Sequence, residues 1–411
     1  MPTPPRQTLS HLRVLDLTRV LAGPWATQLL ADMGAEVIKV ERPKTGDDTR
    51  SWGPPFLRDR EGRETAESSY FLSANRGKKS ITVDLANPEG QALIRSLARE
   101  VDVVVENYKV GTLARYGLGY EQLCEINPRL VYCSVTGFGQ DGPYAALPGY
   151  DFVFQGMGGL MSITGLPDGE PGAGPVKCGI AISDILGGMY ASSAVLAALE
   201  HRHVSGRGQY IDLALLDCVI ALQSYQATNY FLSGETPARM GNAHTNMVPY
   251  QAFACREGHV IVAVGNDSQY QSFCKVIERP DLAADERFVR AAQRVRHRAE
   301  LIPIVTEVMT TRTMADWIAR MEAANVPCGP IYDMAEVFED PHVIERGLRR
   351  TLPHPLGVDM PALGNPIRFS DTPIRIERPA PMLGQHTDAV LGEVLGLGPG
   401  AIADLRARAV L

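Results

Sequence analysis

Asp184 heads the long apolar segment KCGIAISDILGGMYASSAVLAALE (177–200). Ser183-Asp184 in front of an apolar run is typical of a helix N-cap, and capping alone would explain both residues. The helix dipole would also hold a carboxylate at this position in its ionised form. The nearby glycines, 179, 187 and 188, would let a substrate approach closely. The segment therefore fits a carboxylate nucleophile as well as a helix cap, and its spacing does not choose between them.

Basic residues recur at predicted strand ends or in the loops that follow. The set comprises Arg42, Arg76, Lys78, Lys79, Lys109 and Arg115. Ligands of open α/β sheets bind beyond the carboxyl ends of the strands, so together these residues would suit phosphate groups. Any one of them alone is typical of a solvated surface. The set, spread over successive strand ends, predicts an anion site.

Other common catalytic patterns are missing from the sequence. The first predicted turn, TRVLAGPWATQ (18–28), has one glycine followed by proline instead of GxGxxG, which argues against NAD binding and leaves Glu41 as a strand-end charge. The nine histidines form no HxxxH pair, and His244 is a lone histidine in a Gly/Asn-rich loop. No GxSxG is present. Seven single cysteines without CxxC predict reduced thiols and no metal site.

The elements that must position these residues alternate between strands and helices. Strands are predicted at 12–17, 36–41, 80–85, 101–107, 130–135 and 209–215, and helices at 24–33, 88–100, 185–203 and 216–232. This alternation predicts an α/β fold with a parallel, doubly wound sheet. The Gly-rich stretch 155–175 is too rich in turn formers for a regular element and is predicted to be a loop.

The pattern changes near residue 230. One arm of a hairpin is predicted at 258–265, and amphipathic helices follow at 268–278, 295–310 and 313–324. We therefore predict three parts, a large Rossmann-like domain (1–225), a small α+β domain (226–330) and a C-terminal segment (331–411) that returns to the large domain.

Composition narrows the class of protein. The 411 residues are 45% hydrophobic with a net charge of −7, which argues against a nucleic-acid binder but leaves room for one bound anion. No uncharged apolar window of about 18 residues and no secretory signal pattern is present, so we predict a cytoplasmic protein without a membrane span.

Long segments of the chain resemble the class III (CaiB/BaiF-type) coenzyme A transferases. The resemblance covers nearly the whole chain in the right order. It rests on LDLTRVLAGPWATQLLADMGAEVIKVERP (15–43), NRGKKSITVDL (75–85), DVVVENYKVGTLARYGLGYE (102–121), YDFVFQGMGGLMSITG (150–165), SDILGGMYASSAVLAALEHRHVSGRGQYIDLAL (183–215), VPCGPIYDM (326–334) and LGQHTDAVL (383–391).

The resemblance implies a role for particular residues. Asp184 matches the catalytic aspartate of the family, Arg42 the arginine at the nucleotide end of CoA, and Tyr150 a tyrosine near the thioester. The other positions implied along the CoA groove are Ala22, Val83, Asn107, Lys109 and Arg115. The resemblance also implies an interlocked homodimer that uses acyl-CoA as substrate, with no tightly bound cofactor and no nucleic-acid or membrane partner.

The resemblance further implies covalent transfer of CoA between carboxylic acids through an aspartyl anhydride and an aspartyl-CoA thioester. Leu21 stands where formyl-CoA:oxalate members have glutamine, and MGNAHTNMVPYQAF (240–253) replaces their Gly-rich loop. RSWGPPF (50–56), GNAHTNMVPYQAF (241–253) and VYCSVTGFGQDGP (131–143) are more similar to the succinyl-CoA:dicarboxylate (glutarate, hydroxymethylglutarate) branch. Succinyl-CoA or a similar donor and a dicarboxylate acceptor are therefore expected.

Two alternatives stay open at this point. The same fold hosts 2-methylacyl-CoA racemases, in which a GHD histidine and the equivalent aspartate form an acid/base pair. Here that segment reads Gly149-Tyr150-Asp151, which removes one partner of the pair. A CoA-binding protein without catalysis is the second alternative.

Overall fold

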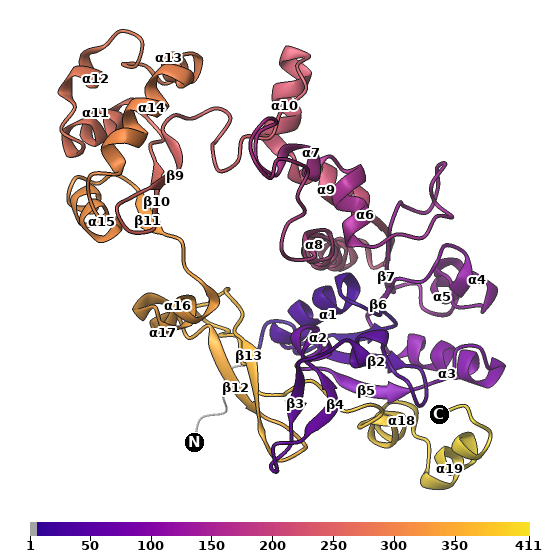
Figure 1. The fold of residues 1–411 in the computed structure, drawn as a ribbon. Helices are drawn as coiled ribbons and strands as arrows, with labels where there is room; N and C mark the ends of the chain where they lie inside the picture. The colour runs from indigo at the N-terminus through magenta and orange to yellow at the C-terminus, as the bar shows by residue number, and fades with distance from the viewer. Residues whose placement is uncertain (1–5) are drawn as a thin grey trace. The chain divides into compact units, whose positions relative to one another are not determined.

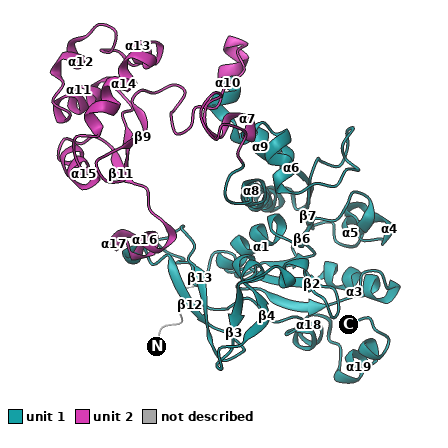
Figure 2. Ribbon diagram, viewed as in Figure 1, with its two compact units in different colours: residues 1–160, 177–228, 344–411 teal, residues 161–176, 229–343 magenta. Residues whose placement is uncertain are grey.

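The computed structural model describes residues 6–411, which cluster into two compact units (Figures 1 and 2). Of the described residues, unit 1 comprises 6–160, 177–228 and 344–411, and unit 2 comprises 161–176 and 229–343. Each unit is described by itself below.

A six-stranded sheet forms the centre of unit 1. Its strands are β1 (Arg13–Asp16), β2 (Glu36–Glu41), β5 (Lys79–Thr82), β6 (Val103–Glu106), β7 (Val131–Thr136) and β8 (Tyr210–Ala214). They pair in the order β5-β2-β1-β6-β7-β8, and every pair is parallel, which confirms the predicted sheet. In chain order this is 3-2-1-4-5-6, the arrangement of doubly wound nucleotide-binding folds. The order reverses between β1 and β6.

Helices cover both faces of the sheet because successive strand residues point to opposite sides. Val14, Val103 and Val105 face one hydrophobic core, and Leu15 and Val104 face the other. The first core is closed by α1 (Ala22–Asp32), α6 (Asp151–Met157), α8 (Ile182–Ser205) and α9 (Leu215–Leu222). The second is closed by α3 (Pro88–Arg99), α4 (Thr112–Arg115), α5 (Tyr120–Ile126), α18 (Thr387–Leu395) and α19 (Pro399–Ala407) (Figure 1).

Two short antiparallel hairpins complete unit 1. They are β3 (Phe56–Arg58) with β4 (Glu64–Ser68), and β12 (Arg349–Pro353) with β13 (Asp359–Leu363). A 3-10 turn, η1 (Asp48–Ser51), and the short helix α2 (Ser69–Ala74) flank the first hairpin along the chain.

Unit 2 contains a three-stranded antiparallel sheet in the order β11-β10-β9. Its strands are β9 (Tyr250–Ala254), β10 (His259–Ala263) and β11 (Cys328–Pro330), and its helices are α11 (Asp267–Val276), α12 (Pro280–Ala284), α13 (Ala291–Arg296), α14 (Arg298–Met309), α15 (Met314–Ala323) and α16 (Met334–Glu339). The predicted hairpin arm and its amphipathic helices are thus confirmed. Three helices lie where the units divide, namely α7 (Leu160–Ile163), α10 (Ser224–Ser233) and α17 (Pro341–Arg346).

Two local predictions are wrong. The segment 155–175 is not a loop throughout, because α6 continues to Met157 and α7 follows it. Phe154 of α6 is fully buried in the core, and this burial outweighs the weak helix propensity of the glycines. The helix predicted over 216–232 is two helices, α9 and α10, separated at Gln223.

The apolar helix α8 is long and apolar enough, by length and composition, to cross a membrane. In the fold it packs against α1 and the sheet, where Val195, Ala198 and Leu199 are buried in the first core. One side of α8 therefore belongs to the core, and 44% of its apolar window is buried.

Candidate active site

A cavity of about 350 Å³ opens beyond the carboxyl ends of β1, β6 and β7. It lies where the strand order reverses, which is the usual ligand position in such sheets. Its lining residues are Arg19, Val20, Leu21, Ala22, Asn107, Tyr108, Lys109, Val110, Thr112, Arg115, Val135, Thr136, Gly137, Ala145, Ala146, Leu147, Pro148, Gly149, Tyr150, Asp184 and Leu215.

Asp184 lines this cavity from the first turn of α8. The helix begins at Ile182 behind Ala181, whose side chain makes no capping hydrogen bond, so the predicted Ser183-Asp184 cap is wrong. Among residues 6–411, no side chain or backbone group hydrogen-bonds or ion-pairs with the Asp184 carboxylate. Burial, together with the nearby charge of Asp151, raises the pKa of Asp184 to about 7. Its environment therefore opposes ionisation, contrary to the prediction from the helix dipole.

Asp151, the first residue of α6, supplies the capping that Ala181 lacks. Its Oδ1 accepts the Ser183 N–H at 2.9 Å and the Ser183 hydroxyl at 2.8 Å, and its Oδ2 accepts Gln155 Nε2 at 2.7 Å. One backbone N–H in the first turn of α8 is thus satisfied by a side chain from another helix.

Gly187 and Gly188 allow α8 to pack closely against its neighbours. A Cβ on Gly188 would lie 2.7 Å from the Ala22 carbonyl oxygen, and a Cβ on Gly187 would lie 2.3 Å from Leu215 Cδ2. These glycines were expected to admit a substrate, but the space beside them is filled by α1 and by Leu215. Their small size brings the N-termini of α1 and α8 together, so that Ala22 and Asp184 line the same cavity.

The turn between β1 and α1 is held by two side chains. Val20 has φ +70°, an unusual conformation for a β-branched residue, and its N–H donates to Asp47 Oδ1 at 3.2 Å. Asn107 Oδ1 accepts the Arg19 N–H at 2.8 Å, and Asn107 Nδ2 donates to the Arg19 carbonyl at 2.7 Å. These contacts fix the backbone that leads into Leu21 and Ala22.

Buried ion pairs account for two of the predicted basic residues. Lys78 donates to Asp16 Oδ2 at 2.9 Å, and both side chains are inaccessible to solvent. Arg76 pairs with Asp32 through two nitrogens. Neither Lys78 nor Arg76 lines the cavity, so these two members of the predicted anion site are structural.

The predicted CoA-groove residues divide into three groups. Ala22, Asn107, Lys109, Arg115 and Tyr150 line the cavity with Asp184. Arg42 lines a smaller adjoining hollow, which shares Arg19 and Tyr108 with the cavity. The Val83 side chain is 2% exposed within the second core and lines neither.

Three of these basic residues have no acidic partner. Arg42, Lys109 and Arg115 are exposed, and none of them forms an ion pair with any residue in 6–411. Arg19, between the two hollows, pairs with Asp48 at 3.0 Å and lies 5.2 Å from the ring centre of Tyr108. The rim therefore offers several cations to a phosphate-bearing ligand.

Arg19, Tyr70 and Tyr108 were not predicted from the sequence. Burial and the charges of Asp184, Asp151 and Asp47 raise the pKa of Tyr70 to about 12, which places its phenol in the electrostatic field of the site. Its ring packs edge-on against Trp52, with 5.0 Å between centroids. RSWGPPF (50–56) was the available signal for this corner, but the segment does not reveal which side chain it meets.

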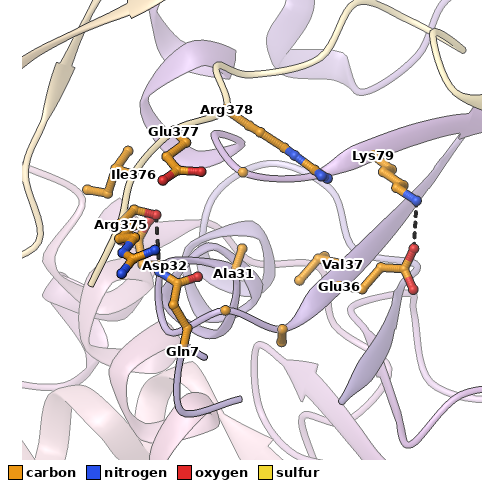
Figure 3. A pocket seen from close by; sticks show the side chains of 13 residues that line it. Gln7, Ala31, Asp32, Glu36, Val37, Lys79, Arg375, Ile376, Glu377 and Arg378 are labelled. Atoms are coloured by element: carbon orange, nitrogen blue, oxygen red, sulfur yellow. Dashed lines mark hydrogen bonds and ion pairs between the residues drawn. The ribbon is translucent and has the colours of Figure 1, made fainter. Parts of the chain in front are cut away.

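A second cavity, of about 270 Å³, lies at the opposite edge of the sheet, near the starts of β2 and β5 (Figure 3). Lys79, another member of the predicted anion site, lies here and pairs with Glu36 at 2.7 Å. Gln7 donates to the Arg375 carbonyl in the same cavity. None of the residues predicted for catalysis or for the CoA groove lines it. Elsewhere in 6–411, no group of three or more His, Cys, Asp or Glu could hold a metal ion.

Comparison with known proteins gives consistent matches over nearly the whole chain. The model of CoA-transferase family III matches residues 9–387. A succinate–glutarate CoA-transferase of Agrobacterium fabrum is 50% identical over 386 residues, covering 94% of this chain and 95% of that protein. A human succinyl-CoA:glutarate CoA-transferase is 43% identical, covering 98% and 90%. The crystal structure of a CAIB/BAIF family protein from Brucella suis is 46% identical with a TM-score of 0.81, covering 95% of this chain and all of that one.

Proposed function

The chain belongs to CoA-transferase family III, and on that premise we propose that it transfers CoA from succinyl-CoA to a second dicarboxylic acid, with Asp184 as the nucleophile. Relatives named as succinyl-CoA:glutarate and succinyl-CoA:mesaconate CoA-transferases support dicarboxylates on both sides of the exchange. A glutarate-like acid is the proposed acceptor. The proposal includes the predicted cytoplasmic location, which cell fractionation checks.

The observation that carries the proposal is the position of Asp184. Its carboxylate is free of hydrogen bonds within residues 6–411 and lines a cavity at the ligand-binding edge of a parallel sheet. A half-buried carboxylate with a purely structural role would normally have hydrogen-bond or ion-pair partners. An unpartnered one that faces a cavity is suited to attack a bound carbonyl.

In the proposed first half-reaction, an Asp184 oxygen attacks the thioester carbonyl of the donor. The C–S bond breaks, which gives a mixed anhydride and the CoA thiolate. The thiolate then attacks the aspartyl carbonyl and releases the donor acid as a carboxylate. The product is a thioester between Asp184 and CoA, so the free energy of the thioester is retained.

The second half-reaction runs the same steps with the acceptor. The acceptor carboxylate attacks the aspartyl thioester, and the CoA thiolate leaves. The thiolate then attacks the acceptor carbonyl of the new anhydride, forming the new acyl-CoA and restoring the Asp184 carboxylate. Backbone N–H groups near the cavity are the proposed donors to the developing oxyanions.

The exposed cations around the cavity are proposed to bind the phosphates of CoA. Lys109 and Arg115 line the cavity, and Arg42 lines the adjoining hollow. Asn107 also lines the cavity and holds the turn between β1 and α1. Ala22 and Tyr150 would lie near the thioester. Val83 would contribute through its backbone, since its side chain is buried.

Exposed apolar side chains on α6 and α8 support a homodimer. Phe152 and Met157 on α6 and Met189 and Tyr190 on α8 are 46–58% exposed, and these two helices contact each other. Large apolar side chains exposed on adjacent helices are typical of a surface that another surface covers. A second copy of the chain, interlocked with the first, is the proposed cover, and light scattering of the eluting protein measures its mass.

Mass spectrometry tests the proposed reaction. The protein is mixed with a panel of acyl-CoAs and free acids, and the new acyl-CoAs are identified. A CoA adduct on the Asp184 peptide is expected after incubation with succinyl-CoA alone. Asp184→Asn is expected to abolish both adduct and transfer. Deuterium entry at C2 without CoA exchange would instead support the racemase reaction. That reaction is disfavoured because Tyr150 stands where racemases have the histidine base.

A further inference from the structure

Asp151 accepts hydrogen bonds on both carboxylate oxygens, and those on Oδ1 join it to the turn that carries Asp184. Oδ1 accepts two from Ser183, the residue directly before Asp184, and Oδ2 accepts one from Gln155. Every partner donates, as the ionised form of a carboxyl group requires. Asp151 is therefore held in place as a carboxylate beside the first turn of α8.

Gln155 extends this arrangement to the segment that leads into α8. Its Oε1 accepts the Cys178 N–H at 2.7 Å, and its Nε2 also contacts the Ile180 carbonyl at 3.3 Å. The Gln155 side chain is fully buried. The path of residues 178–183, and with it the direction of the Asp184 side chain, is thus set from α6.

We propose that Asp151 is a positioning residue for the CoA transfer reaction, which fixes the first turn of α8 and places a second negative charge beside the Asp184 carboxylate. This inference rests on the proposed function, in which Asp184 is the nucleophile.

Within residues 6–411, no opposite charge offsets the effect of Asp151 on Asp184. Tyr70 faces it from α2, and its phenol is neutral at physiological pH. At the packed ends of α1 and α9 the residues are Ala22, Trp25 and Leu215, which carry no charge. The cations on the same cavity, Arg19, Lys109 and Arg115, form no ion pair with Asp184. Asp151 is therefore the charge that acts most directly on the nucleophile.

A second negative charge has a chemical use at this position. Together with burial it raises the pKa of Asp184 to about 7. A more basic carboxylate is a better nucleophile, and with a pKa near the working pH a large fraction is still ionised. An ordinary carboxylate would be fully ionised but less reactive toward a thioester.

The pH dependence of kcat with Asp151→Asn tests the proposal. The variant keeps the shape of the side chain and an acceptor for Ser183 but removes the charge. With succinyl-CoA and glutarate at saturation, the acid limb between pH 5 and 9 is expected to move down by about one pH unit. Transfer above pH 8 is expected to slow several-fold because Asp184 becomes less basic. Ser183→Ala, which removes one hydrogen bond but no charge, is the matched control and is expected to keep the original acid limb.

An unchanged acid limb in a folded Asp151→Asn protein would overturn the proposal and leave Asp151 as a helix cap only. If that variant does not fold, Asp151→Ser retains a hydroxyl acceptor for Ser183, and the same shift is expected there. Asp184→Asn is measured in the same series. Retained transfer in Asp184→Asn would overturn the proposed function and this inference with it, whereas an inactive Asp184→Asn with an unshifted Asp151→Asn rejects the role of Asp151 alone.

Discussion

Asn107 and Arg19 are joined by two hydrogen bonds of opposite direction: the Arg19 N–H donates to Asn107 Oδ1, and Asn107 Nδ2 donates to the Arg19 carbonyl oxygen. The Asn107 side chain thus satisfies the Arg19 backbone N–H and carbonyl as a neighbouring β-strand would. Because Arg19 leads into the strained Val20 and then into Leu21 and Ala22, this pair fixes one wall of the cavity.

Asn107→Ala is expected to leave both Arg19 backbone groups without their partner, which costs about 1–3 kcal/mol. The wall would loosen, and the KM for acyl-CoA should rise by about tenfold. Asn107→Asp keeps the acceptor for the N–H and loses only the donor, so a smaller effect is expected. Urea unfolding and steady-state kinetics measure the two changes. Equal KM values for both variants and the unmodified enzyme would contradict the role given to the pair.

Asp184→Asn is expected to stabilise the protein at pH 8. An acid whose folded pKa is raised binds more protons when folded, so its contribution to stability falls as the pH rises from about 4 toward 7. Removing the charge should therefore raise the free energy of unfolding by roughly 1–3 kcal/mol at pH 8 and by little at pH 4. Denaturant unfolding at the two pH values measures this difference. Destabilisation at pH 8 would show that the carboxylate has a stabilising partner.

Gly188→Ala is expected to push α8 away from α1, since the new methyl would lie 2.7 Å from the Ala22 carbonyl oxygen. Overpacking of this kind costs about 1–3 kcal/mol, and displacement of Asp184 should reduce kcat by more than tenfold. Gly400→Ala is the control. Gly400 lies in the exposed first turn of α19, and a Cβ added there would meet no neighbouring atom within 4 Å. That substitution should alter stability by no more than about 1 kcal/mol. Urea midpoints and kcat are the measurements, and similar results for both variants would refute the packing argument.

Arg115→Ala is expected to raise the KM for acyl-CoA by about tenfold with little change in kcat, because a phosphate contact is made equally in the ground and transition states. The effect should shrink at high salt as the attraction is screened. Arg99→Ala removes another exposed arginine, which lies outside the cavity, and should leave KM unchanged. A fall in kcat without a change in KM would place Arg115 in the chemistry instead.

Much of the sheet could be predicted because its signals are local. The strand at 36–41 has the predicted bounds, since a short apolar run between turns has few other solutions. The last turn of α6 (Asp151–Met157) was missed because Phe154 is buried by residues distant in sequence, which no local pattern reports. Helix boundaries that depend on tertiary packing cannot be predicted from local helix propensity.

The candidate site was predictable only in its list of residues. Resemblance and strand-end position pointed to Arg115 and Asp184, which do share a cavity. Lys78 and Arg76 fit the same strand-end pattern, but each is paired with a buried carboxylate that is distant in sequence. The raised pKa of Asp184 was missed because both of its causes, burial first and the charge of Asp151 second, arise from tertiary packing, including that of α6 on α8.

The packing of α1 on α8 also bears on how the chain acquires activity during synthesis. Ala22 emerges from the ribosome about 160 residues before Asp184, so the two sides of the cavity are separated by most of the sheet in translation order. Contacts this distant in sequence form slowly and only after the intervening strands have paired. Enzymatic activity in a translation time course should therefore appear only once β8 and α9 have left the exit tunnel, and shorter nascent chains should be inert.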